Sequence, residues 1–91
     1  MSDLRLLAKS LNRNGVDFVM VDLDAALTFM DVADASRVSE IRQRNHQNAR
    51  KAYETAGRLL QKLSPSAEQQ REIGLKLARL KGRLVAAGQG F

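Results

Sequence analysis

Residues 48–84, NARKAYETAGRLLQKLSPSAEQQREIGLKLARLKGRL, carry the strongest fold signal in this chain. Small and apolar residues recur at alternating steps of four and three on both sides of a Ser-Pro, which is the heptad spacing of packed helices. The first series is Ala49, Tyr53, Ala56, Leu60 and Leu63, and the second is Ile73, Leu77, Leu80, Leu84 and Ala87. Proline cannot continue a helix but suits the first turn of the next one. The stretch therefore predicts an antiparallel pair of helices, at 39–63 with Ser39 as N-cap and at 65–87 with Ser64 as N-cap.

Helical spacing is also present on the N-terminal side of this pair. Leu4, Leu7, Ala8 and Leu11 predict a short amphipathic helix that Asn14-Gly15 ends, so that residues 1–21 form an N-terminal helix and a linker. Leu23, Leu27 and Met30 predict a main helix at 22–35, with Asp22 as its N-cap and Asp24 in its first turn. The expected fold is all-α: one domain over residues 1–91, a small antiparallel three-helix bundle with a short additional N-terminal helix.

Composition narrows the possible classes of protein. With 91 residues the chain can form one small domain with a modest core. It contains no cysteine and one histidine, which excludes a disulfide scaffold and a zinc site built on Cys or on several His. There is no run of about 20 apolar residues and no signal-peptide-like stretch, so we expect a soluble cytoplasmic protein that does not enter the membrane.

The net charge of +5 is unevenly distributed. Residues 16–35 hold five aspartates and no base, whereas residues 36–63 hold seven bases and two acids, so the two segments can pair internally. One row of cations lies opposite the Ala49–Leu63 series and is a possible partner-binding site. This basic stripe consists of Arg44, Lys51, Arg58 and Lys62. A solvated helix face is the plainer interpretation, because no aromatic side chain is interleaved for base stacking; phosphate binding is the alternative.

Residues 21–29, VDLDAALTF, resemble the first motif of haloacid dehalogenase-type phosphatases, in which two aspartates end a buried strand. Such enzymes need further Asp ligands for magnesium and alternating strands and helices. This chain has no aspartate after Asp34, and Ala25-Ala26 follows where that family usually has Gly-Thr. The sequence predicts a helix start here, not a catalytic site.

Two other features raise questions about packing. Gly57 and Gly74 fall level in the expected helix pair, and each costs about 1 kcal/mol relative to Ala inside a helix. We predict a notch at this level that accepts the third helix, with tolerated surface glycines as the alternative. His46 lies on the helix seam, which favours a partly buried, hydrogen-bonded side chain over a catalytic one.

The stretch NARKAYETAGRLL places Ala49, Tyr53 and Ala56 at spacings that resemble the second helix of tetratricopeptide-like hairpins. With AALTFMDVADAS before it and REIGLKLARLKGRL after it, the three-helix order over residues 23–86 is similar to a microtubule-interacting and trafficking (MIT) domain. This resemblance implies a protein-interaction module whose grooves accept a partner helix or peptide.

These observations lead to one functional expectation and one alternative. We expect a non-catalytic protein–protein interaction or scaffold module without a cofactor, whose partner is another protein or a second copy. A homodimer would form through residues 1–21, whose apolar side chains exceed what a three-helix bundle can bury. The alternative is a small basic nucleic-acid-binding protein.

Overall fold

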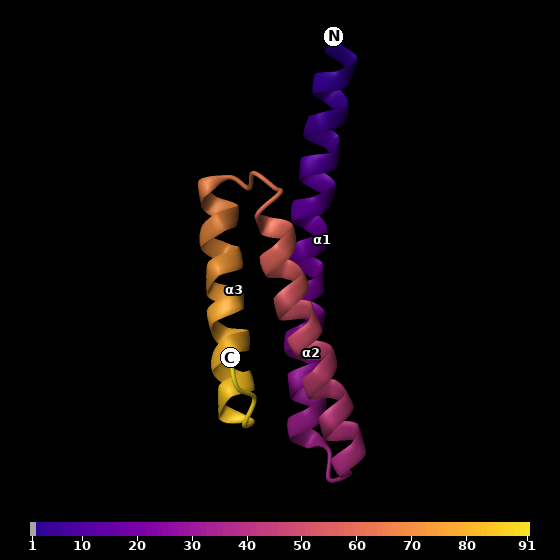
Figure 1. Ribbon diagram of the computed structural model, residues 1–91, viewed down its shortest axis with the longest axis vertical. Helices are drawn as coiled ribbons and strands as arrows, with labels where there is room; N and C mark the ends of the chain where they lie inside the picture. The colour runs from indigo at the N-terminus through magenta and orange to yellow at the C-terminus, as the bar shows by residue number, and fades with distance from the viewer. Residues whose placement is uncertain (1) are drawn as a thin grey trace.

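The computed structural model describes residues 2–91, which form three helices and no strand. Helix α1 spans Ser2–Ala35, α2 spans Ser39–Leu60 and α3 spans Ala67–Ala86. Helix α2 runs antiparallel along the C-terminal part of α1, and α3 returns in the direction of α1 (Figure 1). The molecule is elongated, with extents of 55 × 20 × 19 Å. The predicted all-α class is confirmed.

The separate N-terminal helix is not observed, because α1 continues without a break through Asn14 and Gly15. The expected linker before residue 22 is helical, so Asp22 is not an N-cap and Asp24 is not in a first turn. The reason is burial of the face that begins at Val16. That face continues at steps of three and four and consists of Val16, Val19, Leu23, Ala26, Met30 and Ala33, each at most 1% exposed. Burial of this row outweighs the cost of about 1 kcal/mol for one glycine in a helix.

Gly15 is a contact point between α1 and the chain that follows α2. A Cβ atom placed on Gly15 would lie 2.6 Å from Leu63 Cδ2, so only glycine leaves room for the leucine as it is placed. One turn earlier, Asn12 Nδ2 donates to the Ser64 carbonyl at 3.1 Å, and Asn12 Oδ1 accepts from the Ser64 N–H at 2.6 Å. The turn between α2 and α3 is therefore attached to α1 at this level.

The core lies around α1, to which α2 contributes small side chains. Ala49, Ala52 and Ala56 are buried on α2, and Ile73, Leu80 and Leu84 are buried on α3. The expected burial of Leu80 is confirmed, but Tyr53, Leu60 and Leu77 are only partly buried. The seam of α2 is rotated toward α1, so that Ala52 is buried in place of Tyr53.

The helix ends differ from the sequence prediction by a few residues. Helix α2 ends at Leu60 instead of 63, and its N-cap position is Val38 instead of Ser39. Helix α3 begins at Ala67 after Ser66, not after Ser64, so Pro65 precedes the helix. Ser66 Oγ accepts from the Gln69 N–H at 3.1 Å, and Gln69 Oε1 accepts from the Ser66 N–H at 2.9 Å. This capping box satisfies the N–H groups of Ser66 and Gln69, and it places the start of α3 at Ala67.

The predicted glycine notch is wrong. Gly57 and Gly74 are exposed, and a Cβ atom on either would have no neighbour within 4 Å. Both are tolerated surface glycines, which is the alternative that the sequence leaves open. Gly15, which the sequence predicts to end a helix, is the glycine with a close neighbour.

Candidate interaction surfaces

Residues 3–11 of α1, here called the arm, extend past the turn between α2 and α3 (Figure 1). The pair of hydrogen bonds between Asn12 and Ser64 marks the end of the bundle on this side. Beyond it every side chain from Asp3 to Lys9 is exposed. Leu4 is 67% exposed, Leu7 55% and Leu11 62%, although leucine is among the residues most often buried. The arm therefore presents a row of leucines without a covering element from its own bundle.

The leucine row continues along α1 onto the bundle. Phe18 is 54% exposed and Val21 67%. Counted from Leu4, and with Asn14 included between Leu11 and Phe18, the positions follow one another at steps of three and four residues. The outward stripe is Leu4, Leu7, Leu11, Phe18 and Val21. Phe18 follows the buried Val16 by two residues, or about 200° around a helix of 3.6 residues per turn. The buried Val19 is only about 100° from Phe18, so helix α1 has an exposed apolar face that lies beside its buried apolar face and is not directly opposite it.

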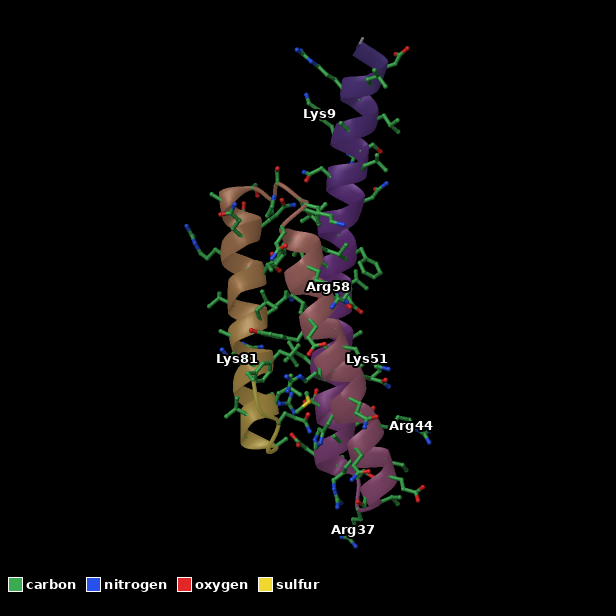
Figure 2. All side chains as sticks on the ribbon, in the orientation of Figure 1. Lys9, Arg37, Arg44, Lys51, Arg58 and Lys81 are labelled. Atoms are coloured by element: carbon green, nitrogen blue, oxygen red, sulfur yellow. The ribbon has the colours of Figure 1, made fainter. Side chains whose placement is uncertain are left out.

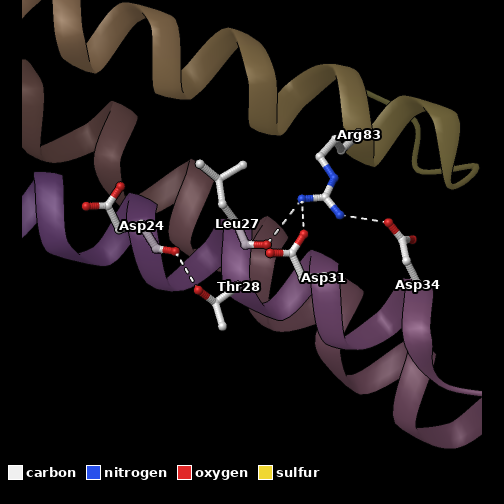
Figure 3. A network of polar contacts seen from close by, with 6 residues as sticks. All are labelled: Asp24, Leu27, Thr28, Asp31, Asp34 and Arg83. Atoms are coloured by element: carbon white, nitrogen blue, oxygen red, sulfur yellow. Dashed lines mark hydrogen bonds and ion pairs between the residues drawn. The ribbon is translucent and has the colours of Figure 1, made fainter.

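The acidic side chains of α1 are used to hold α3. Arg83 donates to Asp31 at 2.8 Å, to Asp34 at 2.7 Å and to the Leu27 carbonyl at 3.3 Å (Figure 3). The hydrogen bond to Asp34 is the main cause of a pKa of Arg83 raised above its ordinary value. Lys76 of α3 forms an ion pair with Asp24 in the same way. Internal pairing of the acidic segment is therefore present, with bases of α3.

Arg44, Lys51 and Arg58 of the predicted basic stripe lie along one exposed side of α2 (Figure 2), and Lys62 is exposed in the turn after it. Within residues 2–91, none of the stripe's four cations takes part in an ion pair. Arg58 donates to the Thr55 hydroxyl at 3.2 Å. Lys51 lines a shallow groove of about 370 Å³ between α1 and α2, whose wall includes Phe18, Asp22 and Phe29. The structure therefore places one residue of the basic stripe beside the outward stripe.

A second groove, of about 280 Å³, lies between α2 and α3 beside the turn that joins them. Its lining is apolar apart from Gln70, and includes Leu60, Leu63, Pro65 and Leu77. About two turns before the end of α2, the ring of Phe91 lies edge-on to Tyr53 at 5.1 Å between centroids, with Arg50 Cζ 4.3 Å from the centroid of the Phe91 ring. The C-terminal residues thus cover Tyr53.

Chemistry that needs a metal finds no support among the described residues. No three His, Asp or Glu side chains in residues 2–91 gather closely enough to hold an ion. His46 is half-buried, as expected, but among the described residues its side chain makes none of the hydrogen bonds that the sequence predicts. In the same part of the chain, none of the helices combines the length and apolar character that crossing a membrane requires.

The sequence places Phe18 and Val21 in the apolar segment 1–21 but in a linker, and so does not predict that they share one helix face with Leu4, Leu7 and Leu11. The signal that could have found them is the three–four spacing that runs from Leu4 through Asn14 to Val21. Asn14-Gly15 interrupts this spacing, because that dipeptide is a common helix stop and predicts that the helix ends there. The comparison with known proteins adds no further residue: no family model, no curated protein and no solved structure matches this chain.

Proposed function

We propose that this chain is a non-catalytic protein-interaction module that binds a partner helix along the outward stripe of α1. The observation that carries the proposal is the exposure of five large apolar side chains in one row, each more than half exposed. Contiguous apolar patches on a protein surface usually mark an interaction site. A helical partner fits because anchors at steps of three and four match the periodicity of a second helix.

The arm adds an energetic reason for a partner. Most of the stability of a helix in a protein comes from packing, and every side chain from Asp3 to Lys9 of the arm is exposed. Full burial of one exposed leucine stabilises a structure by about 1.5–3 kcal/mol. Covering Leu4, Leu7 and Leu11 would therefore stabilise both the arm and the complex. Helix binding also agrees with what the tetratricopeptide-like and MIT-like resemblance implies.

Nucleic-acid binding through the basic stripe is the second candidate. It is favoured by four exposed cations on one side of α2 that make no ion pair within residues 2–91. Such a row would bind phosphates with a strong dependence on salt. The outward stripe is the better candidate because a solvated helix face needs no partner, whereas an apolar row gains free energy from one.

Site-specific photocrosslinking in cells tests the proposal. A photoreactive amino acid is placed at Leu7 or at Phe18, and the matched control carries it at Leu75, which is 67% exposed on α3 and outside the stripe. We expect protein adducts from Leu7 and Phe18 and few from Leu75. Adducts that are equally weak at all three positions would refute a protein-binding stripe. Nucleic-acid adducts in place of protein adducts would favour the second candidate.

A further inference from the structure

We infer that the partner helix of the outward stripe is acidic along one edge of its apolar face, and that this edge pairs with cations of α2. The inference rests on the proposed function and names the chemistry of its partner. The groove between α1 and α2 has two unlike sides. Phe18 and Phe29 of α1 supply apolar surface, whereas Lys51 of α2 supplies a positive charge. A helix that lies in this groove contacts both sides.

The α2 side of the groove is one continuous edge of that helix. Asn48, Lys51 and Thr55 line the groove at steps of three and four residues. Arg44 lies four residues before Asn48 and Arg58 three residues after Thr55, so both continue the same edge. Arg58 donates to the Thr55 hydroxyl at 3.2 Å, which holds its guanidinium beside the groove. The α2 cations, Arg44, Lys51 and Arg58, therefore follow one another at about 10.5 Å along the helix.

The α1 side stays apolar along the length of this edge. Phe18 is 54% exposed, Val21 67% and Val32 44%, and Phe29 is half-buried in the groove. Phe18, Val21 and Val32 lie within about 60° of one another around α1. Because α2 runs antiparallel along this part of α1, the apolar row and the α2 cations run side by side (Figure 1). The surface therefore fits a helix whose apolar face is bordered by charge.

The α2 cations are available to such a partner. Within residues 2–91 none of them forms an ion pair. The aspartates of α1 that do form ion pairs contact α3, through Lys76 and Arg83. Two acids lie near the α2 cations: Glu40, one turn before Arg44, and Asp22 in the groove. Three cations and two acids leave a positive edge, which is complementary to carboxylates of a partner.

An acidic helix fits this surface better than a nucleic acid does. Asp22 lines the groove and would repel a phosphate backbone. Val21 and Val32 expose aliphatic side chains beside the cations, and these offer no ring on which a base could stack. A helix would cover the valines with its apolar face. Carboxylates seven residues apart on its edge would match the spacing of the α2 cations.

Two designed helical peptides test this inference. Both carry leucines at steps of three and four residues. The acidic peptide has glutamates seven residues apart beside the leucines, and the neutral peptide has glutamines there. Fluorescence anisotropy of the labelled peptides gives their Kd. We expect the unmodified chain to bind the acidic peptide about tenfold more tightly, which is the combined effect of three exposed ion pairs. This preference should vanish at about 1 M salt, where the Debye length is about 3 Å.

Two triple variants remove the same charge from different places. The groove variant changes Arg44, Lys51 and Arg58 to Gln, and should lose the preference while it binds the neutral peptide as before. The control variant changes three exposed cations of α3 to Gln and should keep the preference. These are Arg71, Arg79 and Lys81. Should the groove variant not fold by circular dichroism, Lys51→Glu replaces it. That variant should prefer a peptide with lysine in place of the central glutamate.

Loss of the preference in the groove variant alone supports the inference. Equal binding of the two peptides, or no binding of either, would overturn it. A preference that survives in the groove variant, or that both triple variants lose equally, would overturn it as well. After any of these results, protein adducts in the photocrosslinking experiment would still uphold the proposed function. A DNA duplex of about 20 base pairs that displaces the acidic peptide at physiological salt would overturn the inference in favour of nucleic acid.

Discussion

Replacing glycine by alanine at positions 15 and 57 should have different effects, although both lie inside helices. At Gly57 the added methyl meets no atom within 4 Å, so the gain in helix propensity of about 1 kcal/mol is unopposed. At Gly15 the same methyl would lie 2.6 Å from Leu63 Cδ2 and 3.2 Å from Cδ1. Leu63 must then leave its rotamer or shift, and overpacking of this kind costs about 1–3 kcal/mol. Gly15→Ala should therefore range from neutral to about 2 kcal/mol less stable.

Thermal unfolding followed by circular dichroism, at one fixed protein concentration, measures this difference. We expect Gly57→Ala to raise the melting temperature by about 4–8 °C and Gly15→Ala not to raise it. A double-mutant cycle supplies the control: in a Leu63→Ala background the obstruction is absent, so Gly15→Ala should stabilise by nearly the full propensity gain. If Gly15→Ala stabilises the otherwise unchanged chain as much as Gly57→Ala does, Leu63 does not pack on Gly15 and our account of α1 at this level is wrong.

Three further substitutions test the core, the attachment of α3 and the basic stripe. Leu80→Ala should cost about 2–5 kcal/mol of unfolding free energy because Leu80 is fully buried. Leu75→Ala on the exposed side of the same helix should cost under about 0.5 kcal/mol, and similar losses for both variants would contradict the assigned faces of α3. Arg83→Met should lower the unfolding free energy by about 1 kcal/mol, because it removes the ion pairs with Asp31 and Asp34. Arg79→Met, on an exposed side of α3, should lower it less, and comparison of the denaturation midpoints of the two variants tests this difference. Changing all four residues of the basic stripe to Gln should leave folding intact, and a tight gel shift at physiological salt that this variant loses would favour nucleic-acid binding.

Sequence alone was sufficient for the all-α class and for helices close to α2 and α3. Heptad spacing depends on local periodicity, which a single chain displays directly. The limits of α3 were also within reach, since Ser66 and Gln69 have the spacing of a capping box. The prediction of Ser64 as the N-cap rests on the rule that proline suits the first turn of a helix. In the structure Pro65 lies just before α3, so the rule does not apply to it.

The continuity of α1 could not be deduced from local signals. Asn14-Gly15 is a common stop, and only the burial of Val16 and Val19 against other helices overrides it. The ion pairs that attach α3, Arg83 with Asp31 and Asp34, depend on how α1 and α3 are rotated relative to each other. Periodicity gives the face of each helix but not which neighbour that face meets. For the same reason the level pairing of Gly57 and Gly74 gave a wrong prediction.

Amide hydrogen exchange of the arm tests most directly whether a partner covers the outward stripe. In the complex isolated from cells, the amides of residues 6–11, which donate within α1, should be protected, and they should lose protection in the variant Phe18→Gln. Phe18 is about 16 Å from Leu7 along one helix, so this change reaches the arm only through a partner that contacts both. Leu75→Gln is the matched control and should leave the arm unchanged. Arm protection that is the same in Phe18→Gln as in the unmodified chain, or absent from both, would contradict a partner along the stripe.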